Sequence, residues 1–164
     1  MPRRQRVLKR PKIQPDKSFN SILVSRLANR IMYDGKKTVA TAIVESALKK
    51  AADELNAAPL EVLETAVNNV KPQVEVKSMR VGGANYQVPI EPYPARQLRL
   101  ALTWIVNSAR AMKGRPMEEK LKDLILLSYK AEGPAVAKRD TVHQTAAGNK
   151  AFAHLASRAS GRKK

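Results

Sequence analysis

The residues of this chain whose type best suits catalysis are its two histidines, His143 and His154. Asp140 lies three residues before His143, but no serine or second histidine stands at a spacing typical of a nucleophile and its base. The absence of cysteine excludes disulfides, thiolate nucleophiles and cysteine-ligated zinc. We interpret His143 as a surface residue near a helix start and His154 as an ordinary residue of a basic helix. The sequence predicts no enzyme, cofactor, metal site or small-molecule substrate.

Cations are the more informative groups. Among 164 residues, 31 Lys and Arg face 14 Asp and Glu, a formal charge of +17. A compact protein with this excess repels itself unless a polyanion neutralises it, so we expect a nucleic acid as partner. Two Phe, one Trp and four Tyr, nowhere interleaved with basic residues, do not form the stacking surface of an RRM or OB fold. Shape recognition of a folded RNA and architectural DNA binding both fit this composition, and a helix-turn-helix DNA reader stays open.

The charge is unevenly distributed along the chain. Residues 1–17 combine seven basic residues with one acid and three prolines, so we predict an extended basic arm that does not contribute to the core. Residues 161–164 form a short basic tail. Residues 51–70 instead contain four acids and no base: Asp53, Glu54, Glu61 and Glu64. One face should therefore point away from the polyanion.

The apolar residues between these ends recur at helical spacing. We predict six helices in a single domain over residues 18–160: at 18–33, from Val39 to about Asn56, from Pro59 to before Pro72, from Pro94 to Gly114, from Pro116 to Gly133, and from Asp140 as cap toward Ser160. The fold class is mainly all-α. No stretch of 18 apolar residues and no signal-peptide pattern occurs, so we expect a cytoplasmic protein with no membrane partner.

One stretch, at about 73–90, alternates with period two instead. Residues 74–77 and 86–90 flank a tip that contains Gly82 and Gly83, which predicts a two-stranded β-ribbon between the third and fourth helices. The ribbon has no sheet to join, and Lys71, Lys77 and Arg80 place charge along it. We therefore expect it to project; the alternative is a hairpin folded back over the helices as a lid.

The ribbon sequence also carries a family resemblance. The runs NNVKP at 68–72, VEVKS at 74–78 and RVGGANYQVP at 80–89 closely resemble the bacterial type of ribosomal protein seven of the small subunit. Two further segments are similar to that family at the right distances, MYDGKK at 32–37 and AGNKAFAH at 147–154. The last helix departs from many members, because it lacks an aromatic Tyr-Arg-Trp after the histidine.

The resemblance implies a structural ribosomal protein: a primary binder of small-subunit rRNA that nucleates assembly of the 3′ major (head) domain. It further implies contacts with exit-site tRNA and with small-subunit proteins nine and eleven. Carried onto this sequence, the expected rRNA-binding residues are Arg3, Arg4, Arg6, Lys9, Arg10, Gly35, Lys36, Lys37, Lys71, Lys77, Arg96 and Arg99. The expected tRNA contacts at the ribbon tip are Arg80, Gly82, Gly83, Asn85 and Tyr86. Arg and Lys would neutralise phosphates, and Gly would permit close approach.

Overall fold

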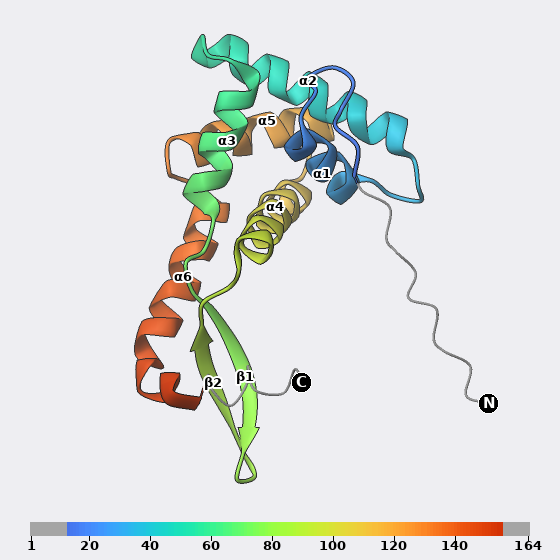
Figure 1. Ribbon diagram of the computed structural model, residues 1–164. Helices are drawn as coiled ribbons and strands as arrows, with labels where there is room; N and C mark the ends of the chain where they lie inside the picture. Colours follow the sequence, from blue (N-terminus) through green and yellow to red (C-terminus); the bar gives the residue numbers. More distant parts are fainter. Residues whose placement is uncertain (1–12, 156–164) are drawn as a thin grey trace, which may run out of the picture.

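The structure is a computed structural model that describes residues 13–155 (Figure 1). The elements follow in the order α1 (Ile22–Ile31), α2 (Lys37–Leu55), α3 (Pro59–Val70), β1 (Glu75–Val81), β2 (Ala84–Ile90), α4 (Pro94–Ala111), α5 (Met117–Tyr129), α6 (Pro134–Gly148) and the 3-10 helix η1 (Lys150–Leu155). This order confirms the mainly helical class and the ribbon between the third and fourth helices. Arg3, Arg4, Arg6, Lys9 and Arg10 of the predicted arm, and the tail at 161–164, lie outside the described residues.

Proline fixes the start of α3 and α4 where the sequence predicted it, with Pro59 and Pro94 in the first turn. The start of α1 is later than predicted, because the residues after Asp16 form a turn first. The Asp16 carboxylate accepts the N–H groups of Ser18 (3.0 Å) and Phe19 (3.4 Å). Ser21 then caps the helix, its Oγ accepting the N–H of Leu23 at 3.3 Å.

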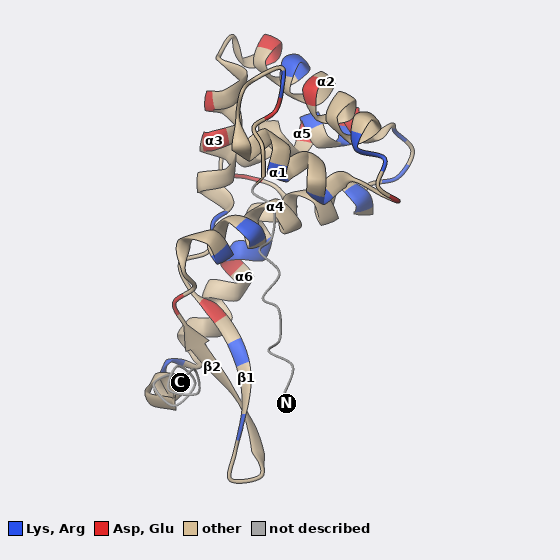
Figure 2. Ribbon diagram, turned by 45° about the vertical axis from the view of Figure 1, so that its right-hand side comes forward, with Lys and Arg blue, Asp and Glu red and all other residues tan. Residues whose placement is uncertain are grey.

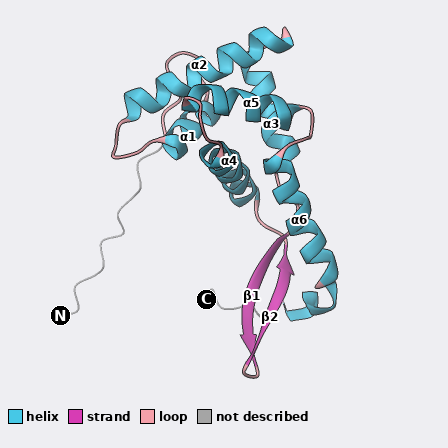
Figure 3. Ribbon diagram, turned by 180° about the vertical axis from the view of Figure 1, so that it is seen from behind, coloured by secondary structure: helices cyan, strands magenta, loops and turns pink. Residues whose placement is uncertain are grey.

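The hydrophobic core lies among α1 to α5 and reaches the start of α6. Fully buried side chains of five helices meet in it: Leu27, Leu48, Leu63, Ile105 and Leu121. Helix α5 packs against α2, α3 and α4, as the view from behind shows (Figure 3). Within residues 13–155, no helix has both the length and the apolar composition to cross a bilayer.

The sixth helix begins earlier than predicted, and the prediction of Asp140 as its cap is wrong. Gly133, with φ +90° and ψ 178°, precedes Pro134, which occupies the first turn of α6. A Cβ on Gly133 would lie 3.0 Å from Cβ of Leu127, so the turn needs glycine both for its conformation and for its close contact. Asp140 lies within the helix and pairs with Arg139 at 2.6 Å. The helix ends at Gly148, and η1 follows it.

Polar contacts tie the end of α3 to α5 and α6. The side-chain amide of Asn69 donates to the carbonyl oxygens of Ser128 (3.0 Å) and Tyr129 (2.9 Å) at the end of α5. Arg139 of α6 donates through Nη1 to the carbonyl of Asn69. Three helices are therefore joined at the point where the chain leaves α3 for the ribbon.

The ribbon is antiparallel, with Glu75 opposite Ile90 and Val81 opposite Ala84. Its strands are longer than predicted, because only Gly82 (φ +58°) and Gly83 (φ +90°) form the tip. Two successive positive φ angles give the tight turn that matches strand twist. The ribbon extends away from α1 to α5, alongside α6 and η1 (Figures 1 and 3). It therefore projects, and it does not form a lid over the helical body.

Candidate nucleic-acid interface

The turn between α1 and α2 presents two neighbouring lysines to solvent. Asp34 (φ +51°) and Gly35 (φ +73°) reverse the chain, and Lys36 and Lys37 open α2. The backbone N–H of Lys36 donates to Tyr33 O at 2.9 Å and that of Lys37 to Gly35 O at 2.7 Å, which fixes the turn. Within residues 13–155 neither lysine has an ion-pair partner, and both are exposed. The predicted trio of Gly35, Lys36 and Lys37 is thus contiguous and its charge is available.

Arg110 adds a third cation here that our sequence reasoning missed. It comes from the last turn of α4, and its guanidinium carbon lies 4.2 Å from the centre of the Tyr33 ring. Its Nη2 also donates to the carbonyl of Ile31 at 3.2 Å, so it caps the end of α1. A signal for it was absent from the sequence, because 77 positions separate Arg110 from Tyr33.

The ribbon carries the second group of predicted residues. Lys77 and Arg80 of β1 are exposed, as are Gly82, Gly83 and Asn85 at or beside the tip. Lys71 ends α3, and its Nζ donates to Oδ1 of Asn68 at 2.7 Å. Tyr86 differs from the others: it is half-buried, and its ring lies 5.1 Å from that of Phe152 with the planes tilted by 53°. Its ring is thus engaged within the protein.

Arg96 and Arg99, at the start of α4, have different surroundings although both were predicted to bind rRNA. Arg96 grips Glu75 of β1 through two hydrogen bonds, Nη2 to Oε1 at 2.6 Å and Nε to Oε2 at 3.1 Å. These bonds from Arg96 hold the pKa of the Glu75 carboxyl below its ordinary value, against the opposing effect of partial burial. Arg99 is exposed and forms no ion pair within the described part of the chain.

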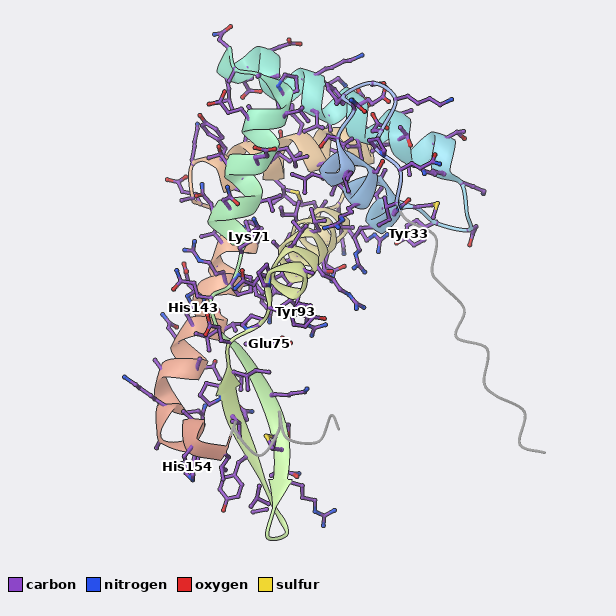
Figure 4. All side chains as sticks on the ribbon, viewed as in Figure 1. Tyr33, Lys71, Glu75, Tyr93, His143 and His154 are labelled. Carbon is purple, nitrogen blue, oxygen red and sulfur yellow. The ribbon has the colours of Figure 1, made fainter. Side chains whose placement is uncertain are left out.

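Neither histidine is arranged for catalysis. His143 lies in the second half of α6, not near a helix start as predicted, and its Nε2 accepts the backbone N–H of Gln73 at 3.1 Å. It joins α6 to the segment that enters the ribbon (Figure 4). Nδ1 of His154 lies 2.9 Å from Ala151 O in η1. Residues 13–155 contain no group of His, Asp and Glu that could hold a metal ion.

Acidic residues collect at the end of the helical body formed by the end of α2 and by α3. Figure 2 shows a group of them at the far end of α2 and along α3, whereas the α1–α2 turn and β1 carry two basic residues each beside one acid, Asp34 or Glu75. Asp53, Glu54, Glu61 and Glu64 are all exposed there. Glu54 pairs with Lys122 of α5 at 2.9 Å. The charge is therefore polarised along the fold, as the acidic stretch at 51–70 predicted.

Comparison with known proteins identifies the family of this chain. Residues 2–150 match the family described as ribosomal protein S7p/S5e. The chain belongs to this family. The resemblance that the ribbon motif indicated is thereby confirmed. Members are structural proteins of the small ribosomal subunit, so the chain is not an enzyme, and the expected ribosomal location is confirmed as well.

Relatives named small ribosomal subunit protein uS7 cover nearly the whole chain. The one from Thermotoga maritima is 51% identical over 152 residues, which are 93% of this chain and 97% of the relative. The one from Thermosipho melanesiensis is 50% identical over 144 residues, 88% of this chain and 93% of the relative. The one from Dictyoglomus turgidum is 51% identical over 154 residues, 94% and 98% of the two chains.

Proposed function

We propose that this ribosomal protein is a primary binder of small-subunit rRNA that nucleates assembly of the 3′ major (head) domain. The observation that carries the proposal is the polarised charge: exposed or half-exposed cations without ion-pair partners among residues 13–155 occupy the α1–α2 turn, the start of α4 and the ribbon, away from the acidic end. The six that the sequence predicted are Lys36, Lys37, Lys71, Lys77, Arg80 and Arg99, and Arg110 at the α1–α2 turn is a further one. Cations on several elements suit a folded RNA whose phosphates approach from several directions.

The remaining predicted rRNA residues take different roles in this proposal. Arg96 is already neutralised by Glu75, so it contributes less phosphate contact than Arg99 and chiefly orients the ribbon base. Gly35 permits a close backbone approach. Arg3, Arg4, Arg6, Lys9 and Arg10 stay predictions as phosphate contacts. Small-subunit proteins nine and eleven are proposed as neighbours on the strength of the family resemblance.

The ribbon tip is proposed to contact tRNA near the exit site. Arg80 and Asn85 are exposed there, and the glycine pair lets a sugar–phosphate backbone come close. Replacing Gly82 and Gly83 by Val disrupts the tip, because β-branched residues rarely adopt positive φ. We expect tRNA occupancy of the exit site to fall more than rRNA affinity. Equal loss of both would place the tip on rRNA instead.

The rRNA proposal is tested by footprinting on small-subunit rRNA, with co-sedimentation of the protein in sucrose gradients. We expect protection confined to the 3′ major domain and competition by a folded transcript of that domain at far lower concentration than by random duplex DNA. Equal competition by duplex DNA would favour the alternative, an architectural nucleoid-type DNA-binding protein, and would overturn the proposal.

A further inference from the structure

The projecting ribbon needs a source of stiffness beyond its own hydrogen bonds. Two strands without a third are marginally stable in water. Gly82 is seven residues beyond Glu75, which corresponds to roughly 23 Å of extended strand. A swing of about 20° at the base would therefore move the tip by about 8 Å, more than the length of a hydrogen bond or a phosphate contact.

Two contacts fix the base of the ribbon. The Arg96–Glu75 pair ties β1 to α4, and the hydrogen bond from Gln73 N–H to His143 Nε2 ties the preceding segment to α6. Both lie at the base of the ribbon, where Figure 4 labels Glu75 and His143. They fix the position of the ribbon base, but contacts so close to the base limit the direction of the distant tip only weakly.

A third contact lies further out. Tyr86 pairs across the ribbon with Met79, which lies four residues or roughly 13 Å beyond Glu75. The ring of Tyr86 contacts that of Phe152 in η1. The centroid distance of 5.1 Å falls within the favourable range for aromatic pairs, and the tilt of 53° lies between the offset-stacked and edge-to-face arrangements. Val88, two residues along the same face of β2, is fully buried, and Leu155 at the end of η1 is 8% exposed. The contact is therefore part of a small apolar interface.

The placement of Phe152 is itself determined by the end of α6. The side-chain amide of Asn149 donates to Thr145 O at 2.8 Å, and the N–H of Phe152 donates to Asn149 O at 3.0 Å. These bonds turn the chain back toward β2. A 3-10 helix of six residues is longer than most, and η1 packs against β2 of the ribbon.

From these contacts we propose that Phe152 is a positioning residue: it braces the ribbon through Tyr86 and so sets the direction in which the tip is presented before any RNA binds. That the braced direction is the one used for RNA rests on the proposed function. Without the ring, the base contacts remain but the outer ribbon samples a wider range of directions. Only a fraction of molecules then has the tip in place, and apparent affinity falls by that fraction.

The direction of the ribbon can be measured in the full chain without RNA. Because the protein has no cysteine, Ala84→Cys beside the ribbon tip and Asn107→Cys on α4, both exposed, accept nitroxide labels specifically. Double electron–electron resonance should give one narrow distance distribution in the labelled parent and in Phe152→Tyr, which keeps a ring. It should broaden in Phe152→Ala, with helical circular dichroism unchanged. An equally narrow distribution in Phe152→Ala would overturn the brace.

A matched control is Tyr33→Ala, which removes an exposed aromatic residue far from the ribbon (Figure 4). We expect it to leave the distance distribution narrow. Broadening in this control too would show that the labels report general loosening of the helices, and would overturn the specific role of Phe152.

The effect of the brace on RNA binding is tested in two titrations. The protein is titrated against a 3′ major-domain transcript, and tRNA is titrated into the exit site of ribosomes that contain the protein. We expect Phe152→Ala to weaken the RNA contact of the tip by about 2- to 13-fold, the factor that an aromatic pair contributes, with the salt dependence unchanged. A broadened distribution with unaltered affinity for both RNAs would refute pre-positioning while leaving the brace. If the parent itself shows no salt-dependent rRNA binding, the proposed function fails, and the distance measurement still decides whether Phe152 braces the ribbon.

Discussion

The difference between Arg96 and Arg99 gives a quantitative test of the interface. Each phosphate that a Lys or Arg neutralises changes the slope of the logarithm of the binding constant K against the logarithm of the salt concentration by roughly 0.7 to 0.9. If the six predicted cations Lys36, Lys37, Lys71, Lys77, Arg80 and Arg99 each contact one phosphate, they contribute a slope of about −4 to −5. Affinity would then fall about 300- to 2,000-fold between 50 and 200 mM salt from these residues alone.

Removing Arg99 should take away one such contact. Arg99→Gln is expected to make the slope shallower by roughly 0.7 to 0.9, which is about a threefold change in the salt-induced loss over the same range. The double variant Glu75→Gln/Arg96→Gln removes an ion pair without changing the net charge. It should leave the slope almost unaltered and lower the melting temperature instead, since the Arg96–Glu75 bonds join β1 to α4.

The assay is fluorescence anisotropy of a labelled 3′ major-domain transcript, titrated at four salt concentrations from 50 to 200 mM. Circular dichroism of each variant shows that its helices are intact. If the double variant lost as much slope as Arg99→Gln, Arg96 would have to leave Glu75 and contact phosphate in the complex. Our assignment of Arg96 to the ribbon base would then be wrong.

Three further predictions concern stability. Gly133→Ala should destabilise the protein more than Gly114→Ala, because both glycines have positive φ but only at Gly133 would the new methyl group lie 3.0 Å from Cβ of Leu127. The additional loss of unfolding free energy should be about 1–3 kcal/mol, or roughly 2–12 °C in melting temperature. Equal melting temperatures of the two variants would contradict the contact argument. The pKa of Glu75 is lowered in the folded protein, so its ion pair stabilises the fold fully above the ordinary glutamate pKa of about 4.3, and this stabilisation is lost as pH falls through the lower folded pKa. The difference in melting temperature between the parent and Glu75→Gln should therefore shrink on acidification below about pH 4. A difference that grows there would contradict this prediction. Leu121→Ala should cost about 2–5 kcal/mol in urea unfolding, whereas Ile22→Ala, at a site 49% exposed, should cost clearly less; similar losses would place Leu121 outside the core.

Local signals predicted most of the fold. Pro59 and Pro94 mark helix starts because proline lacks the N–H that a first turn leaves unpaired, and period-two alternation marks the ribbon because side chains of a strand alternate between faces. The same reasoning failed at α6, where Asp140 was predicted as the cap but the helix begins at Pro134, directly after Gly133. The proline and the left-handed glycine were the stronger signals there.

The parts of the site that sequence reasoning missed depend on contacts between distant residues. Arg96 and Glu75 are 21 positions apart, His143 and Gln73 are 70 apart, and neither spacing repeats with any helical or strand period. Which cations remain available for a ligand is decided by such contacts. The sequence could therefore identify Lys36, Lys77 and Arg99 as candidates, but it could not separate Arg99 from Arg96.

The joint formed by Asn69, the end of α5 and Arg139 has a mechanical consequence. A protruding hairpin attached through a slack connector would yield to any pull at its outer end. Here the chain leaves α3 directly from a residue bonded to two other helices. Tension applied at the glycine pair would be transmitted through the braced ribbon into the helices and resisted there, so the ribbon should not hinge at its junction with α3.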